Sequence, residues 1–236
     1  MTESSQSVFF VDYFEFPNLA EVRFANWVTG PDGFFKFEDP ISEGSLTSIY
    51  APRLTGTPSL EEVAITGHLV LTTVDLSALT EAGDIRIVTN PELVDVKLPE
   101  LTVASFVNMI DNKLLEQLSL PKLRTTNSLD IRDNENLVGI FLPVLTTSRL
   151  FFRVIDNPSL QTLCAPNLEV GGSVCIANES NQPSLGADLS SLVTGFFSGF
   201  SDDCYGGIDP PTNQLNAPTV CGVVPDGLFT TEGCQN

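Results

Sequence analysis

The sequence predicts an all-β protein: a right-handed parallel β-helix, or leucine-rich-repeat-like solenoid, of about eight coils with a disulfide-stapled C-terminal cap. Three observations predict it. A short motif recurs about every 22 residues, each repeat holds a segment in which apolar residues alternate with others, and all five cysteines follow residue 163. A 22-residue coil is too short for a strand-helix-strand unit, so we expect short strands joined by corner turns.

The repeated motif is a tetrad of an apolar residue, proline, any residue and leucine. In four tetrads the prolines are 22, 22 and 23 residues apart, at Pro99, Pro121, Pro143 and Pro166. Proline is tolerated at a corner because it interrupts no strand pairing there. Two upstream tetrads also match, and two later or intervening ones keep only the leucines: Ala51-Pro52-Arg53-Leu54, Phe16-Pro17-Asn18-Leu19, Leu76-Ser77-Ala78-Leu79 and Leu189-Ser190-Ser191-Leu192. Apolar residues stand six and three positions before the proline slot, and in the first coil these are Val11 and Phe14.

A second strand precedes an asparagine in four coils. Ile87 and Ile85 lie three and five residues before the first asparagine, and the same period-2 pattern recurs in the next three coils, as expected for a strand with one buried face. We expect the asparagine amides to cap backbone groups at a corner and to bond one another between coils. His68 occupies the same slot one coil earlier, which favours a corner cap over a catalytic base. This structural ladder comprises Asn90, Asn112, Asn134 and Asn157.

A calcium site is the alternative interpretation of this ladder, because Asp111, Asp133 and Asp156 immediately precede three of the asparagines. The glycine-rich nonapeptide of calcium-binding solenoids is absent, however. We therefore predict no metal site and no cofactor.

Two regions follow from the repeat. Residues 1–195 form the solenoid, with an N-terminal cap and insertion at 1–45, and residues 196–236 form a Cys/Gly/Pro-rich cap or stalk. Clustered cysteines are typical of disulfides in an oxidising compartment, and their odd number leaves one thiol for an intermolecular disulfide. The disulfide candidates are Cys164, Cys175, Cys204, Cys221 and Cys234. A sequon at Asn178 predicts glycosylation.

Charge limits the partners. The 30 acidic and 11 basic residues give a net charge of -19, which disfavours nucleic acid and anionic membrane surfaces. No apolar run is long enough for direct membrane insertion. The N-terminal segment lacks the features of a secretory signal, which fits either an intracellular protein or a mature ectodomain. The cysteines favour the second, so we expect a secreted or surface-displayed protein.

The repeat resembles that of the receptor L domain. In order, it contains leucines, a glycine such as Gly83, an apolar pair such as Ile85 and Ile87, an asparagine and the Leu-Pro-x-Leu tetrad. This domain occurs in insulin- and EGF-receptor ectodomains, and fungal GPI-anchored cell-wall proteins share the repeat. The resemblance covers roughly residues 8–192. It implies a right-handed β-helix related to leucine-rich repeats, in an extracellular or wall-associated protein with disulfides near the C-terminal cap. The motif contains only core and corner positions, so it transfers no ligand contacts.

Outward positions beside the asparagine strands form the candidate binding face. Aromatic, aliphatic and arginine side chains on an exposed sheet have the composition of interface hot spots. The candidates are Arg86, Phe106, Asn108, Ile110, Asp130, Arg132, Phe151, Arg153 and Ile155. We expect a protein or glycan ligand there. The alternative is that the insertion from Trp27 to Ser45, with Phe34, Phe35 and Phe37, covers this face.

The sequence contains few side chains that could act as catalytic groups. A single histidine and the absence of phosphate-binding motifs leave no catalytic residue to assign. Glycoside hydrolysis requires a pair of neighbouring carboxyl groups. The outward positions of the asparagine strands mix positive and negative charges and place no two acids side by side. We predict a non-enzymatic recognition or adhesion module. The alternatives are a carbohydrate-active β-helix enzyme and a structural wall or ice-binding protein, the last suggested by Thr80, Thr102, Thr125 and Thr146.

Overall fold

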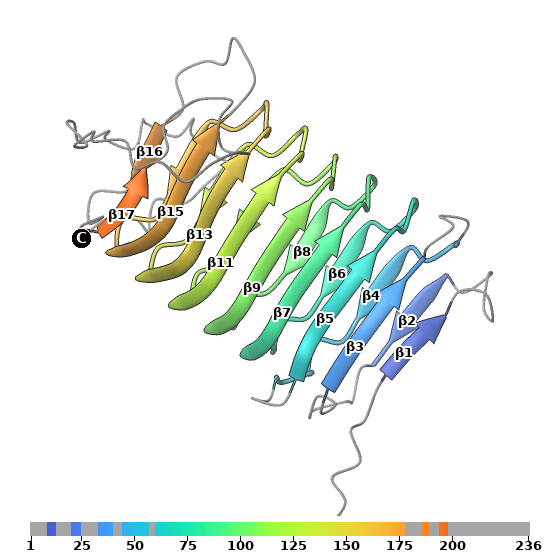
Figure 1. Ribbon diagram of the computed structural model, residues 1–236. Coiled ribbons are helices and arrows are strands. Elements are labelled where there is room, and N and C mark those ends of the chain that lie inside the picture. Colours follow the sequence, from blue (N-terminus) through green and yellow to red (C-terminus); the bar gives the residue numbers. More distant parts are fainter. Residues whose placement is uncertain are drawn as a thin grey trace, which may run out of the picture.

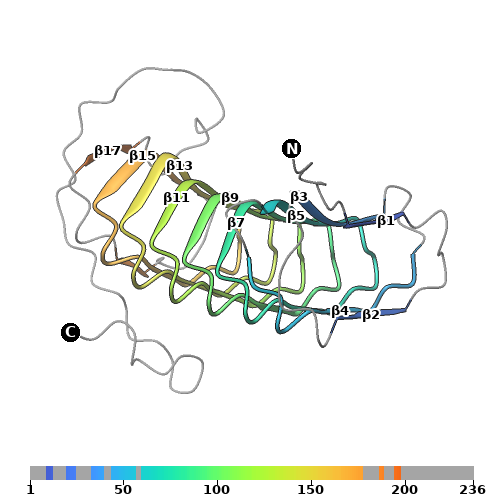
Figure 2. The same cartoon turned by 90° about the horizontal axis from the view of Figure 1, so that it is seen from below.

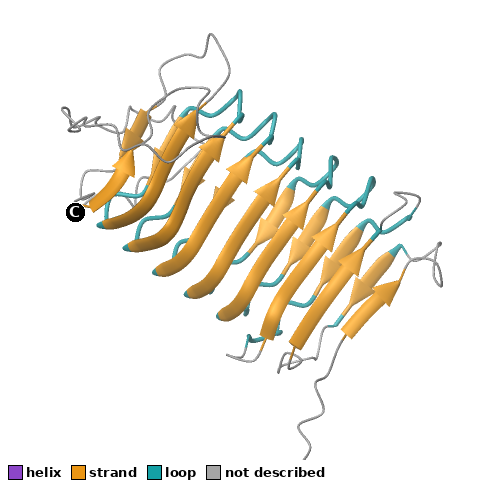
Figure 3. Cartoon of the chain, viewed as in Figure 1, coloured by secondary structure: helices purple, strands orange, loops and turns teal. Residues whose placement is uncertain are grey.

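The computed structural model describes residues 9–12, 20–24, 33–39, 44–56, 60–177, 186–188 and 194–197. Every regular element among these residues is a β-strand, and none is a helix (Figure 3). Successive strands alternate between two flat layers (Figure 2). The predicted all-β parallel solenoid is therefore confirmed.

One layer is a nine-stranded sheet in which every neighbouring pair is parallel (Figure 1). Its strands are β1 (Phe9–Asp12), β3 (Gly33–Glu38), β5 (Leu60–Thr66), β7 (Glu81–Val88), β9 (Val103–Ile110), β11 (Thr125–Arg132), β13 (Thr147–Ile155), β15 (Val170–Ala177) and β17 (Thr194–Phe197). We call it the long sheet.

Two four-stranded parallel sheets make up the opposite layer, in the orders β2-β4-β6-β8 and β10-β12-β14-β16. All their strands are three residues long: β2 (Glu21–Arg23), β4 (Ser48–Tyr50), β6 (Thr73–Asp75), β8 (Asp95–Lys97), β10 (Gln117–Ser119), β12 (Gly139–Phe141), β14 (Thr162–Cys164) and β16 (Gly186–Asp188). Each coil therefore has one short and one long strand.

The structure supports about six turns rather than the predicted eight. Complete coils run from β4 to β15, whereas the corners that would close the first and last coils lie outside the described residues. The register predicted for the first coil is also wrong, although its tetrad at Pro17 lies outside the described residues. Val11 lies in the long sheet opposite Phe37, and Val22 on β2 pairs with Ile49 of the next short strand. The short-strand slot of that coil thus belongs to Val22, because local motif matching cannot detect a register set by pairing between distant strands.

Both corners of a coil are tight turns, which explains the spacing of the tetrads. The amide of Leu101 donates to the carbonyl of Leu98 at 3.3 Å across the proline corner, and Leu93 donates to Asn90 at 3.0 Å across the asparagine corner. A proline in the second position of such a turn has the backbone angle that the turn needs. The repeated prolines and asparagines thus mark the two corners.

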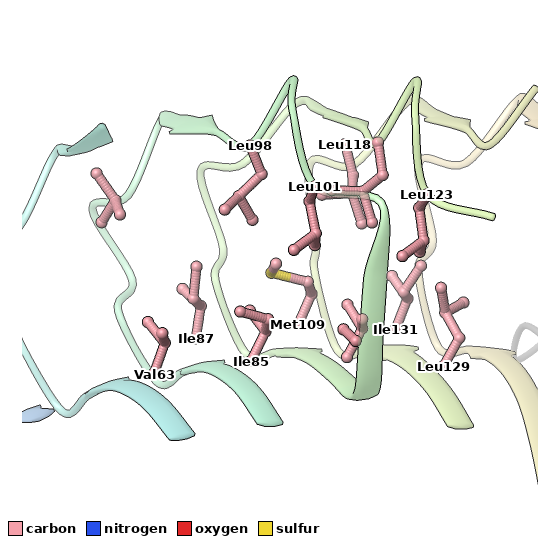
Figure 4. Close-up of a cluster of buried hydrophobic side chains, with 14 of the residues drawn as sticks. Val63, Ile85, Ile87, Leu98, Leu101, Met109, Leu118, Leu123, Leu129 and Ile131 are labelled. Carbon is pink, nitrogen blue, oxygen red and sulfur yellow. The ribbon is translucent and has the colours of Figure 1, made fainter. Parts of the chain in front are cut away.

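The core is a single apolar layer between the long and short strands. Ile85, Ile87, Leu98 and Leu101 of one coil are at most 1% exposed. They point toward one another between the two layers, and the next coil repeats the arrangement with Met109, Leu118 and Leu123 (Figure 4). Burying a leucine or isoleucine side chain contributes ~1.5–3 kcal/mol, so stacked coils stabilise one another through this continuous core.

The insertion predicted at residues 27–45 does not cover the outer face of the long sheet where it is described. Residues 33–38 are strand β3 of that sheet, and Phe35 and Phe37 are fully buried in the core beside Val63 and Ile65. Trp27 lies outside the described residues. The alternation of aromatic and polar residues over 33–38 is itself a strand pattern, which the longer spacing of this coil obscured.

Candidate binding face

Strands β9, β11 and β13 place nine outward side chains in three rows, which we call the central outer face. Register puts Ser128 between Phe106 and Phe151, Asp130 between Asn108 and Arg153, and Arg132 between Ile110 and Ile155. Eight of the nine are the predicted candidates. The ninth predicted residue, Arg86, lies on β7 beside Asn108 of β9. The outward alternation in the sequence includes Ser128, but the predicted ligand contacts do not.

Exposure differs across this face. Phe151 is 39% exposed, whereas Ile155 is only 3% exposed and Ser128 6%. Ile155, one of the predicted ligand contacts, lies on this face but is buried. Strand alternation gives the direction of a side chain, but neighbours one strand away, ~4.8 Å apart, can still shield it.

A β-bulge pushes two apolar side chains of β13 into solvent. The pairing with β11 shifts between Thr126 and Ser128, where β13 contains one extra residue. This residue accounts for the single 23-residue spacing in the repeat. Leu150 in the bulge is 50% exposed, and the Arg153 guanidinium lies 4.2 Å from the centre of the Phe151 ring. Bulges commonly re-aim side chains at functional sites.

The middle strand of the face carries polar atoms that lack hydrogen-bond partners within the described residues. They are Ser128 Oγ, Asp130 Oδ1 and Arg132 Nε, all shielded from solvent. Arg132 Nε lies 3.5 Å from the other oxygen of Asp130, an ion-pair distance. Burial raises the pKa of Asp130 above its usual range, and the positive charges of Arg132 and Arg153 partly oppose that shift.

An acid pair lies farther along the same outer surface, contrary to the sequence analysis. Glu62 on β5 stands directly beside Asp84 on β7. Lys36 is ion-paired with Glu62, and Arg86 Nη1 lies 3.2 Å from Glu62 Oε1. Burial, and then the Glu62 carboxylate, raise the pKa of Asp84. The pair was missed because the outward assignment in the sequence did not extend to β5.

The asparagine ladder is a continuous hydrogen-bonded column at one corner. Asn112 Nδ2 donates to the Ile87 carbonyl of the previous coil at 2.9 Å and to Ile110 of its own at 3.2 Å. The Asn134 Oδ1 atom accepts from the Asn112 backbone amide at 3.1 Å. Asn90, Asn134 and Asn157 each donate to the same two kinds of carbonyl. These amides satisfy backbone groups that the corner would leave buried and unpaired.

His68 extends this ladder by one coil. Its backbone amide donates to Asn90 Oδ1 at 3.1 Å. Its Nε2 atom lies 3.0 Å from the Phe37 carbonyl of the previous coil, where an asparagine of the ladder has its Nδ2 atom. Burial lowers the pKa of His68, while the bond to Phe37 and the Asp39 charge act in the opposite direction. The side chain is 1% exposed, so it is a corner group out of contact with solvent.

The residue before each asparagine has left-handed backbone angles: φ is 56° at Thr89, 54° at Asp111, 59° at Asp133 and 52° at Asp156. Asp and Asn tolerate this conformation better than other side-chain-bearing residues, which explains the aspartates. A surface groove of about 870 Å³ runs along them, lined by Thr89, Ile110, Asp111, Lys113, Asp133, Glu135, Asp156 and Pro158. Among the described residues, no three metal-ligating side chains converge.

The threonines suggested for ice binding bond between coils. Thr102 Oγ1 donates to the Thr80 carbonyl at 2.9 Å, and Thr146 Oγ1 donates to the Arg124 carbonyl at 3.1 Å. Thr125 lies apart, at the start of β11. These hydroxyl donors thus hold neighbouring coils together.

The predicted cap and modification sites lie mostly outside the described residues. Cys164 and Cys175 are buried on β14 and β15. Cys204, Cys221, Cys234 and Asn178 fall outside the described part of the chain. The disulfide-stapled cap and the glycosylation therefore stay predictions. In the described part of the chain, no helix is long and apolar enough to cross a membrane.

The fold and this face define the chain as a parallel β-solenoid with a mixed aromatic and polar outer surface. Comparison with known proteins found no matching family model, no matching curated protein and no matching solved structure.

Proposed function

We propose that the chain is a non-enzymatic recognition or adhesion module, secreted or displayed at a cell surface, that binds a protein or glycan through the central outer face. The main support for this proposal is the exposed Phe151 ring, which lies beneath the Arg153 guanidinium and next to the exposed Leu150 side chain on the bulge. Aromatic and arginine side chains dominate the binding energy of interfaces. A rigid sheet holds them in place without a folding cost on binding.

We further propose that the solenoid winds to the right and belongs with receptor L domains. Support comes from the asparagine ladder and the two turn-forming corners, which occupy the positions of the family motif. Right-handed crossovers are also the general rule for parallel strands.

The test uses the double variant Phe151→Glu with Arg153→Glu, screened with the wild type on glycan and protein arrays. The matched control is Tyr50→Glu with Arg23→Glu, because Arg23 stacks at 4.6 Å on Tyr50 on the opposite layer. We expect the ligand bound by the wild type to be lost by the first variant and kept by the control. Circular dichroism checks that both fold. Undiminished binding by the first variant would remove the central outer face as the site.

A carbohydrate-active enzyme is the second candidate, and the Glu62–Asp84 pair favours it. Two adjacent carboxyl groups, of which one has a raised pKa, are the minimum for general acid and base catalysis of glycoside cleavage. Release of reducing ends from a polysaccharide, abolished by Asp84→Asn but not by Asp95→Asn on β8, would establish this activity. Release abolished by Asp130→Asn instead would place the chemistry on the central outer face.

A further inference from the structure

We propose that the ligand of the central outer face is an uncharged carbohydrate chain lying along β11. Ser128, Asp130 and Arg132 would bind its hydroxyl groups, and Phe151 would stack on a sugar ring. This inference rests on the proposed binding function and specifies its ligand class.

The first argument is the set of polar atoms without partners. Buried polar groups in folded proteins are nearly always hydrogen-bonded, so each exception calls for an explanation. Here three exceptions, at Ser128, Asp130 and Arg132, occupy successive outward positions of one strand. A ligand or water that pairs with them recovers part of the free energy lost on burying a polar atom alone.

The second argument is the kind of atom at each position. A serine hydroxyl donates and accepts, a carboxylate oxygen accepts, and a guanidinium nitrogen donates. A sugar hydroxyl both donates and accepts, so one glycan chain can satisfy all three. The spacing of the side chains along β11 is roughly 6.6 Å, because they lie two residues apart on a strand.

The third argument is the composition on either side of this polar row. Phe106 and Ile110 flank it on β9, and Phe151 flanks it on β13, where Ile155 is buried. Pyranose rings have polar edges and apolar C–H faces, so a chain along β11 would meet matching surfaces on three strands. A polypeptide suits this face less well. A bound strand pairs through a regular series of backbone hydrogen bonds, and the side chains of this face do not supply such a series.

The charges favour a neutral glycan over an anionic one. The face holds one carboxylate, on Asp130, and two guanidinium groups, so it offers at most one uncompensated positive charge. Arg132 is ion-paired with Asp130, and Arg153 stacks on Phe151. A polyuronate would bring one negative charge per sugar to a chain whose net charge is -19, and only one of those charges could meet an uncompensated cation on this face. Because the three polar atoms are shielded from solvent, a ligand reaches them only when neighbouring side chains on β9 or β13 move aside.

The experiment measures retardation of the full chain in native gels containing a neutral β-glucan, a mannan or polygalacturonate, with an array of neutral oligosaccharides alongside. Variants are Phe151→Ala, Ser128→Ala and Asp130→Asn, and the control is Tyr50→Ala. We expect the wild type to bind at least one neutral glycan, and Phe151→Ala and Asp130→Asn to bind it about tenfold more weakly. Ser128→Ala should weaken binding without lowering the melting temperature, because its hydroxyl has no partner to lose.

Three results would overturn the inference: no binding to any neutral glycan, binding only to polygalacturonate, or neutral-glycan binding unaffected by all three variants. A protein ligand whose binding is lost in Phe151→Glu with Arg153→Glu would leave the proposed function standing while removing the carbohydrate. Absence of every ligand on both arrays would remove both.

Discussion

Asn134 Nδ2 donates to Asn157 Oδ1 in the next coil at 3.0 Å, and the same amide group also bonds the carbonyls of Met109 and Arg132 at 2.9 Å each. One side chain thereby satisfies backbone groups of two coils and contacts a third. Repeated along the corner, this relationship makes the asparagine column a cooperative element of the fold.

Replacing Asn134 by alanine should destabilise the protein by ~1–3 kcal/mol, because buried carbonyls and the Asn112 amide lose their partner. The measurement is urea unfolding followed by circular dichroism. Asn136→Ala is the matched control, since that side chain is exposed two residues away, and its effect should stay within ~0.5 kcal/mol. Equal stability of the two variants would mean that the amide ladder does not stabilise the coil.

Replacing His68 by asparagine should make the ladder uniform and change the pH dependence of stability. Burial lowers the pKa of native His68, so the unfolded chain binds a proton more readily than the native one. Wild-type stability should therefore fall as the pH drops below ~6.5, the usual histidine value, through the lowered native pKa. In thermal melts across this range, the variant should lose less stability than the wild type. Parallel curves for the two proteins would contradict the burial of a neutral histidine.

Asp130→Asn tests the opposite sign of pH dependence. The raised pKa of native Asp130 means that the native state holds this proton at a pH where the unfolded chain has released it. Acidification from neutral pH toward the ordinary carboxyl range near ~4 should therefore stabilise the wild type through this group. The melting temperature of Asp130→Asn should rise less than that of the wild type over this interval. An equal rise in both would show that Asp130 is no more buried than an ordinary surface carboxyl.

Gly83→Ala should destabilise the fold by ~1–3 kcal/mol through overpacking. A Cβ atom at Gly83 would lie 2.2 Å from the Glu61 carbonyl oxygen on the neighbouring strand. Ser105 lies between Ala104 and Phe106, the β9 partners of Ala82 and Asp84, and already carries a side chain, so Ser105→Ala serves as the control. Thermal melts compare the two variants, and a neutral Gly83→Ala would show that β5 can move away from β7.

The sequence by itself determined the coil. Leucines and isoleucines at a fixed spacing are buried together when the chain winds into coils of that length. Prolines and asparagines at the corners can adopt the turns that this winding requires. Ile85, Ile87, Leu98 and Leu101 are accordingly core residues, as their spacing predicts. The 23-residue interval also marks the one place where an extra residue enters β13, although spacing alone could not say that it would expose Leu150.

Tertiary structure decided everything that depends on pairing between coils. Only strand register could place Val11 opposite Phe37, assign residues 33–38 to the sheet, and bring Glu62 beside Asp84. Register also set Ser128 between two phenylalanines and left its hydroxyl without a partner. The physical reason is that a repeat specifies which side of a strand faces the core through local alternation. What stands next to a residue on the outer surface is set by residues about 22 positions away, whose identities the core does not constrain.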